Sequence, residues 1–185
     1  MSKNSIKKAL ELISLLLPEN DIDFLLVGGF AVNYYGYTRS TLDLDLMIAV
    51  EVQERLTEVM LQAGYTNFSQ HRNVVFFQKP GTALRLDFLK AEADSLQKLL
   101  SRSKQIEIAG VALRIPCLND LLAMKLFAIE HGREFRGNKD LEDVVQLVIA
   151  NRLDPDKDIK PLCQQYASNE VYEQLCQRIK QYLKS

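Results

Sequence analysis

The stretch Leu25–Val50, LLVGGFAVNYYGYTRSTLDLDLMIAV, decides how the rest of the chain can fold. An apolar run ends at Gly28-Gly29, a short amphipathic segment follows, and a second apolar run contains Asp43 and Asp45. Because strand side chains alternate, the two aspartates point to one face of a strand, with Cβ atoms about 6–7 Å apart. Such like charges repel, so the pattern predicts a positive partner, and a divalent cation with a polyphosphate suits carboxylate oxygens. The alternative is that both aspartates face solvent at a strand end.

The composition is that of a globular protein with a sizeable core. The chain has 185 residues, of which 47% are hydrophobic and 25% charged, which predicts one domain or a compact core with a helical appendage. The net charge of -1 provides no general basic surface, so a polyanion would need a local patch. No apolar run reaches about 18 residues, and the N-terminus does not resemble a signal peptide, so we expect no membrane partner. Three scattered cysteines without zinc spacing indicate free thiols in the cytoplasm.

Strand patterns fill the first part of the chain and helix patterns the second. We expect strands at 24–27, 42–50, 74–78, 83–89, 105–109 and 111–115, with helices at 4–17, 30–35, 52–63 and 94–102. Beyond Pro116 we expect only helices, at 119–131, 139–149, 155–167 and 170–183, with a break at Gly137-Asn138. Strands followed by helices favour an α+β fold. We divide the chain into a core at 1–115 and a C-terminal helical region at 116–185 that packs on it.

The glycine pair is suited to a phosphate ligand. Glycine lets the backbone approach a ligand closely, and the helix expected after Gly29 offers free N–H groups at its start. The stretch lacks the lysine and Ser/Thr of a P-loop, does not match the dinucleotide fingerprint, and has no EF-hand spacing. Those three classes of site are therefore excluded.

A further aspartate lies in a later strand. In Ala83–Leu89 the alternation places Asp87 on the same face as Arg85. Asp87 is thus either a third carboxylate for a shared site or the partner of Arg85 in a salt bridge.

The first motif resembles a known superfamily. Gly28-Gly29, then Arg39 and Thr41, then Asp43-Leu-Asp45-Leu is similar to the signature of nucleotidyltransferases typified by DNA polymerase beta. The resemblance implies a small mixed β-sheet flanked by helices, followed by C-terminal helices. It also implies a third carboxylate on a strand beside the Asp-apolar-Asp strand, which assigns that role to Asp87.

The helical half carries a second resemblance. Leu121-Leu-Ala-Met-Lys125-Leu-Phe-Ala128, then Arg133, then Lys139-Asp140-Leu-Glu-Asp143, is similar to the abortive-infection toxin type of nucleotidyltransferase and its small relatives. This implies that Lys125 contacts the nucleoside triphosphate and that Asp140 and Asp143 orient Lys125 or the incoming substrate. The alternative for Lys125 is that it extends its charged head group to solvent from an otherwise apolar helix face. The alternative for Asp140 is that it lies in the first turn of a helix, where the helix dipole favours an acid.

Together the resemblances imply transfer of a nucleoside monophosphate from a nucleoside triphosphate to a hydroxyl or phosphate. Two Mg²⁺ (or Mn²⁺) ions held by Asp43, Asp45 and Asp87 would clamp the attacking and leaving oxygens. Asp87, or a metal-bound hydroxide, would help to deprotonate the acceptor. The backbone of Gly28 and Gly29 would bind the triphosphate, and Arg39 and Thr41 would support that loop.

Three interpretations therefore remain open. The first is an active nucleotidyltransferase whose acceptor is RNA, a protein or a small molecule. The second is a non-catalytic module that binds nucleotide or a partner, for example an antitoxin in a toxin–antitoxin pair. The third is that the acids form only an ion-pair network, for which a close bridge between Arg85 and Asp87 would be evidence.

Overall fold

The computed structural model describes residues 3–41, 43–71, 73–132 and 134–184. The described residues fall into two compact units. Unit 1 comprises Met1–Ala31 and Ser40–Cys117, and unit 2 comprises Val32–Arg39 and Leu118–Ser185. The sequence predicted one boundary after residue 115. In the structure the chain also leaves unit 1 for the short segment Val32–Arg39 before it returns to form the aspartate-bearing strand.

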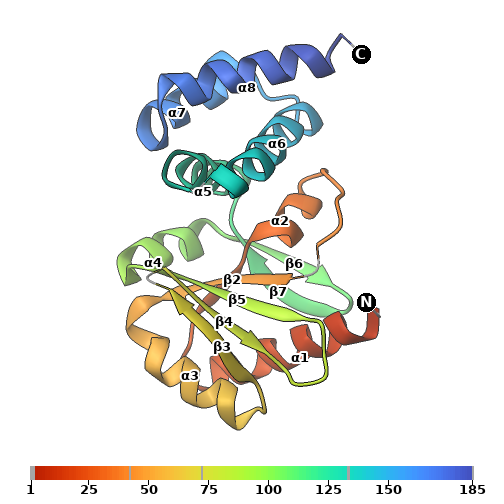
Figure 1. Cartoon of the computed structure of the whole chain (residues 1–185), viewed down its shortest axis with the longest axis vertical. Helices are drawn as coiled ribbons and strands as arrows, with labels where there is room; N and C mark the ends of the chain where they lie inside the picture. Colours follow the sequence, from red (N-terminus) through yellow and green to blue (C-terminus); the bar gives the residue numbers. More distant parts are fainter. Residues whose placement is uncertain (1–2, 42, 72, 133, 185) are drawn as a thin grey trace. The chain divides into compact units, whose positions relative to one another are not determined.

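A mixed β-sheet organises unit 1 (Figure 1). Its strands lie in the order β1 (Phe24–Leu26), β2 (Asp43–Ala49), β5 (Arg85–Ala91), β4 (Val74–Gln78) and β3 (Thr66–His71). Strands β2 and β5 are parallel, whereas the other neighbours pair antiparallel. The α+β class predicted from the sequence pattern and the mixed sheet implied by the resemblance are confirmed.

Helices and a hairpin cover this sheet. The remaining elements of unit 1 are α1 (Lys3–Glu19), the start of α2 (Gly28–Tyr34), the 3-10 turn Val50–Val52, α3 (Gln53–Gln62), α4 (Ala93–Arg102), β6 (Lys104–Ile108) and β7 (Val111–Ile115). Helix α4 packs against β1 and β2, α3 packs against β3, and α1 packs against the β6–β7 hairpin.

The sheet's core explains the spacing of the aspartates. Leu44, Leu46 and Ile48 of β2 are fully buried, so the alternation of the strand turns Asp43 and Asp45 to its other face. Phe88 on β5 is also fully buried, and its ring meets that of Phe77 edge to face, with centroids 5.7 Å apart.

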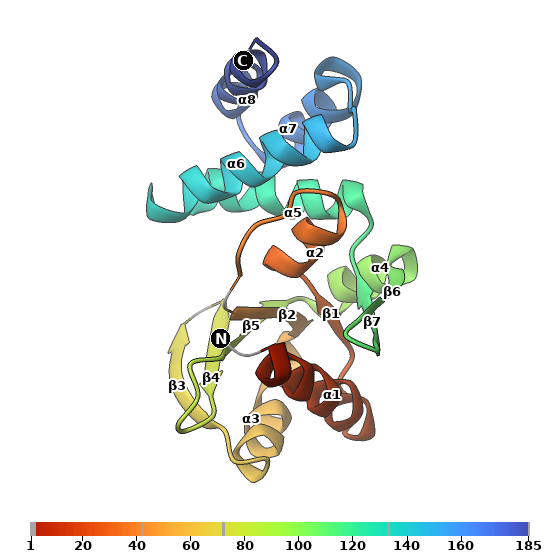
Figure 2. The same ribbon diagram turned by 90° about the vertical axis from the view of Figure 1, so that its right-hand side faces the viewer.

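Unit 2 is helical (Figure 2). It contains α5 (Leu118–His131), α6 (Glu134–Ala150), a π turn at Pro155–Ile159, α7 (Lys160–Tyr166) and α8 (Asn169–Tyr182). Helix α5 packs on α6, α7 and α8, and the Asn151 side chain donates a hydrogen bond of 2.9 Å to the carbonyl of Tyr35, which ties the segment Val32–Arg39 to the helices. No helix in the described ranges is long and apolar enough to cross a bilayer.

One strand was missed and one predicted helix break was wrong. Strand β3 was not predicted, because its sequence, TNFSQH, lacks the apolar alternation that identifies a strand. The break predicted at Gly137-Asn138 does not occur, since α6 runs from Glu134 to Ala150. Each of these residues costs a helix only about 1 kcal/mol or less relative to alanine, which the packing of the buried residues farther along the helix can offset. The predicted strand residue Leu42 lies outside the described residues.

Candidate active site

The pairing of β2 with β5 brings the predicted carboxylates together in unit 1. In this parallel pair, Asp43 lies opposite Arg85 and Asp45 lies opposite Asp87. Asp43 and Asp45 are half-buried, whereas Asp87 is only 1% exposed. The expectation that the strand of Asp87 lies beside the Asp-apolar-Asp strand is confirmed.

Arg85 links two of these carboxylates. Its Nε donates a hydrogen bond of 2.6 Å to Oδ1 of Asp87, and its Nη2 donates to Oδ2 of Asp87 at 2.8 Å and to Oδ2 of Asp43 at 3.0 Å. The guanidinium also lies over the ring of Phe76, 4.9 Å from the centroid. This is the close Arg85–Asp87 bridge that the ion-pair interpretation expects. The additional bond to Asp43 was not foreseen.

Charges in this cluster are not balanced. Burial raises the pKa of Asp87, and the neighbouring Asp45 and Asp43 raise it further; the hydrogen bond and charge of Arg85 oppose this rise without cancelling it. The pKa of Arg85 is raised by its hydrogen bond to Asp87. With every group ionised, three carboxylates face one guanidinium, so the cluster of these four side chains is negative. A negative cluster of oxygens attracts cations.

Gly28 is required where the first turn meets Asp45. Its φ is +59°, and a Cβ at this position would overlap the Asp45 carboxylate. The backbone N–H of Val27 donates a 2.8 Å hydrogen bond to the carbonyl of Asp45. The turn is therefore packed directly on the aspartate strand, and Gly29 is the second residue of α2. Binding of a triphosphate by Gly28 and Gly29 stays a prediction.

Thr41 acts on the same strand through the backbone. Its Oγ1 donates a hydrogen bond of 3.2 Å to the carbonyl of Asp43. This bond joins the Thr41 side chain to the backbone of Asp43. Support of the glycine loop by Thr41 stays a prediction.

A second charged cluster lies in unit 2. The Nζ atom of Lys125 is 2.5 Å from Oδ1 of Asp140 and 2.8 Å from Oδ2 of Asp143. Arg39 binds Asp143 with two parallel bonds, from Nε to Oδ1 at 2.6 Å and from Nη2 to Oδ2 at 2.9 Å. The resemblance implied that Asp140 and Asp143 orient Lys125 or the incoming substrate, and in the structure both contact Lys125. It did not predict that Arg39 joins this cluster.

The unit 2 cluster is buried and balanced. Side-chain exposure is 1% for Asp143, 12% for Lys125 and Asp140, and 14% for Arg39. Burial alone would raise the pKa of Asp143, but hydrogen bonds and charge from Arg39 and Lys125 outweigh it and lower that pKa. Burial would lower the pKa of Lys125, but Asp140 and Asp143 outweigh it and raise that pKa. Two cations thus neutralise two anions.

Asn33 is a positioning residue that sequence reasoning missed. Its side-chain amide donates to the carbonyl of Arg39 and accepts from the N–H of Arg39, both at 3.0 Å. The six-residue separation gives no periodic signal that could have revealed this clamp. It holds the backbone of Arg39 while the guanidinium of Arg39 reaches Asp143.

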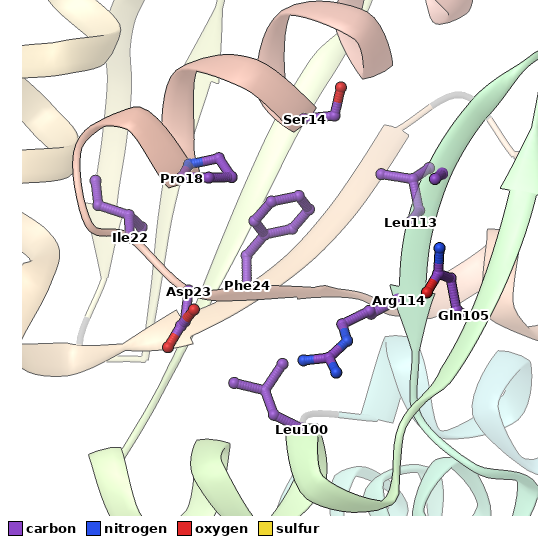
Figure 3. A pocket seen from close by; sticks show the side chains of 10 residues that line it. Ser14, Pro18, Ile22, Asp23, Phe24, Leu100, Gln105, Leu113 and Arg114 are labelled. Carbon is purple, nitrogen blue, oxygen red and sulfur yellow. The ribbon is translucent and has the colours of Figure 1, made fainter.

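A separate cavity of about 260 Å³ opens elsewhere in unit 1 (Figure 3). Phe24, Leu100 and Leu113 provide apolar walls, and Asp23 and Arg114 provide one carboxylate and one guanidinium. None of the predicted site residues lines this cavity.

Asp43, Asp45 and Asp87 fit a hard divalent cation in the type of their donors. Within the described ranges, no three His, Cys, Asp or Glu side chains are already arranged as a metal site. Oxygens of Asp43 and Asp87 nevertheless converge on one guanidinium nitrogen, at 3.0 and 2.8 Å. Mg²⁺ and Mn²⁺ favour such carboxylate oxygens. The point on which the oxygens converge is the position of the Arg85 guanidinium.

Comparison with known families decides the relationship of the chain. The profile of a family described as nucleotidyltransferase of unknown function (DUF6036) matches residues 4–184. The chain belongs to this family. A search of curated proteins found no match.

Solved structures share the nucleotidyltransferase fold. ANT(2'')-Ia in complex with adenylyl-2''-tobramycin is 16% identical, with a TM-score of 0.62 over 94% of this chain and 98% of that one. An antigenic nucleotidyltransferase-like protein from Paracoccidioides brasiliensis is 19% identical, with a TM-score of 0.56 over 80% and 78% of the two chains. The lincosamide antibiotic adenylyltransferase LnuA, bound to lincomycin, is 10% identical, with a TM-score of 0.53 over 80% and 98%.

Proposed function

We propose that this nucleotidyltransferase family member transfers a nucleoside monophosphate from a nucleoside triphosphate to an acceptor hydroxyl or phosphate. A bond forms between the acceptor oxygen and the α-phosphorus, the bond from that phosphorus to the pyrophosphate oxygen breaks, and the acceptor proton leaves. The observation that carries the proposal is the convergence of Asp43, Asp45 and Asp87 on the paired strands β2 and β5, in a chain of this family.

Each carboxylate has a proposed role. Asp43, Asp45 and Asp87 would hold Mg²⁺ or Mn²⁺, which when bound neutralises charge on the phosphates and on the reacting oxygens. Asp87 would also accept the proton of the acceptor, because it lies beside the other two carboxylates and burial raises its pKa. Gly28, which lies against Asp45, and Gly29 would offer backbone N–H groups to the triphosphate.

For the unit 2 cluster we propose that its charged side chains hold one another in position. Lys125 is bonded to both Asp140 and Asp143, and Arg39 shares Asp143. A lysine whose charge is already balanced by two carboxylates attracts a phosphate less than a free one does. Contact between Lys125 and the triphosphate stays a prediction, and a Lys125→Gln variant that binds nucleotide as tightly as the wild type would remove it.

The acceptor class that we propose to test first is a hydroxyl-bearing small molecule. The net charge of -1 does not favour an extended surface that binds a polyanion such as RNA. One neighbour in fold is described with adenylyl-2''-tobramycin, the adenylyl derivative of a small molecule. RNA and protein acceptors remain the alternatives.

A second candidate function is a non-catalytic nucleotide- or partner-binding module, with an antitoxin as one possible partner. The observation that favours it is the Arg85 bridge, because a guanidinium bonded to Asp43 and Asp87 could serve as their permanent counter-ion.

Transfer of labelled phosphate separates the two candidates. The protein is incubated with Mg²⁺ and each nucleoside triphosphate labelled at the α-phosphate, together with aminoglycosides and lincosamides, total RNA, or a protein extract as acceptor. We expect label on one acceptor class with the wild type and none with Asp45→Asn. Absence of transfer to every acceptor, with nucleotide binding intact, would favour the non-catalytic module.

A further inference from the structure

We propose that Arg85 is an internal counter-cation that holds Asp43 and Asp87 together in the metal-free protein and gives up its place when a divalent cation binds. Arg85 is then a positioning residue that sets how tightly the carboxylates bind the ion. This inference rests on the proposed function, because it assumes that these carboxylates are metal ligands.

The geometry of the guanidinium carries the first step. Arg85 makes two bonds to Asp87, at 2.6 and 2.8 Å, and a third, at 3.0 Å, to Asp43 on the neighbouring strand. The fork of a guanidinium matches a carboxylate in this way, and a lysine ammonium cannot reproduce it. Arg85 therefore fixes the orientation of one carboxylate and the distance to a second.

Burial explains why the metal-free protein needs this cation. The Asp87 side chain is only 2% exposed, and an ionised carboxylate buried without a partner is strongly unfavourable. Asp45 lies directly opposite Asp87 in the strand register, so the repulsion between like charges adds to this penalty. Arg85 offsets both effects in the absence of metal.

Arg85 is also placed so that it can leave. Its side chain is 33% exposed and that of Asp43 is 37% exposed, so the guanidinium is only partly desolvated. Its face lies over Phe76, 4.9 Å from the ring centroid, a contact that a small rotation of the side chain would retain. Among these four side chains, Arg85 brings one positive charge to the carboxylates, whereas a divalent ion brings two charges to the same oxygens.

If a divalent cation displaces Arg85 from the carboxylates, removal of Arg85 should strengthen metal binding. We would titrate wild type, Arg85→Gln and Arg85→Lys with Mn²⁺ alone and follow free Mn²⁺ by electron paramagnetic resonance. Glutamine keeps polarity but has no charge, so Arg85→Gln should bind Mn²⁺ at least about tenfold more tightly, a factor that corresponds to about 1.4 kcal/mol. Lysine keeps the charge, so Arg85→Lys should lie between the two. Asp87→Asn, which removes a ligand, is the control and should bind more weakly than the wild type.

Each pattern of affinities decides a different question. Tighter binding of Mn²⁺ by Arg85→Gln, or binding by this variant alone, supports displacement of Arg85 by the cation. Equal or weaker binding of Mn²⁺ by Arg85→Gln leaves the metal site and the proposed function intact but overturns the displacement of Arg85 by the cation. No binding to any variant that unfolds cooperatively overturns both.

A measurement on the wild type guards against a variant that fails to fold. The Nε–H resonance of Arg85, assigned by its absence in Arg85→Lys, is followed by nuclear magnetic resonance during titration with Mg²⁺. The hydrogen bond to Asp87 protects this proton from exchange with water. We expect saturating Mg²⁺ to shift the resonance and speed its exchange. An unchanged resonance at a Mg²⁺ concentration that raises the thermal midpoint of the protein would contradict the proposal.

Discussion

The two charged clusters of this protein both pair aspartates with basic side chains, and they differ in charge balance and in exposure. In unit 1, Arg85 serves Asp43 and Asp87 beside a third carboxylate, Asp45, and its side chain is 33% exposed. In unit 2, Arg39 and Lys125 neutralise Asp140 and Asp143, which are buried. A negative, partly exposed cluster can accept a further cation, whereas a neutral, buried one is complete. The unit 1 cluster is therefore the candidate for metal-dependent chemistry, and the unit 2 cluster is the candidate for a structural role.

The largest expected effect tests the scaffold. Asp143→Asn leaves Arg39 and Lys125 buried with a neutral amide between them, and breaking a buried ion pair costs about 3–5 kcal/mol. We expect a loss of this order in the free energy of unfolding, measured by urea denaturation. The control is Glu11→Gln, which removes an exposed pair with Lys7 and should cost less than about 1 kcal/mol. Equal effects for the two variants would show that burial does not distinguish the unit 2 cluster.

A somewhat smaller effect tests the contact between Gly28 and Asp45. Gly28→Ala adds a Cβ that overlaps the Asp45 carboxylate at a positive φ, whereas Gly64→Ala meets positive φ alone, with nothing within 4 Å of the new Cβ. Backbone strain costs about 1–2 kcal/mol at both sites. We therefore expect Gly28→Ala to lose clearly more stability than Gly64→Ala and also to weaken binding of Mn²⁺. Equal losses with unchanged Mn²⁺ binding would mean that Asp45 moves aside freely.

Loss of the paired hydrogen bonds from Arg39 to Asp143 should change the free energy of unfolding by a smaller amount. Arg39→Lys keeps the charge beside Asp143 but replaces two parallel hydrogen bonds by one at most. We expect a loss of about 1.5 kcal/mol in the free energy of unfolding, because one hydrogen bond to a charged group contributes about 1.5–3 kcal/mol and lysine retains the charge. Arg55→Lys is a matched control, since Arg55 donates to the backbone carbonyls of Asn20 and Asp21 from an exposed position. The unfolding free energy should change less in this control.

The dependence of stability on pH should have opposite signs for the two clusters. The pKa of Asp143 is lowered, so its stabilisation is present above the unfolded pKa of about 3.9 and is lost as pH falls through the folded value. The pKa of Asp87 is raised, so its contribution is greatest below about pH 4 and declines as pH rises through the folded value.

Urea denaturation between about pH 3 and pH 7 would reveal this contrast. On acidification, the stability of the wild type relative to Asp143→Asn should shrink, whereas its stability relative to Asp87→Asn should grow. Parallel changes in both comparisons would contradict the assignment of the two shifts.

Local patterns predicted most of the fold. The alternation of Leu44, Leu46 and Ile48 identified β2, and the change of pattern at Pro116 identified the helical half. Strand β3 escaped because its polar sequence is stabilised by pairing with β4, which no local pattern encodes. The break predicted at Gly137-Asn138 failed because tertiary packing overrides a weak local preference.

The candidate site could be predicted only in part, because its contacts join distant segments. The pattern placed Asp43 and Asp45 on one face, and the resemblance added Asp87, but the strand register that puts Arg85 opposite Asp43 has no signature in one sequence. The bond between Arg39 and Asp143 spans 104 residues. Sequence reasoning assigned Arg39 to the support of the glycine loop and Asp143 to the orientation of Lys125 or the incoming substrate, since it could not show that Arg39 and Asp143 pair with each other.

Calorimetric titration with nucleoside triphosphates tests the central claim most directly. Each of the four nucleotides is titrated with Mg²⁺ into wild type, Asp45→Asn and, as a control for folding, Asp154→Asn, which alters an exposed carboxylate of unit 2. We predict Mg²⁺-dependent binding to the wild type and to Asp154→Asn. Asp45→Asn should bind at least about 10–100-fold more weakly, the loss expected when a partner of a metal site is removed. Binding that survives unchanged in Asp45→Asn, or that needs no Mg²⁺, would contradict the claim that the carboxylates of β2 and β5 form a metal-dependent nucleotide site.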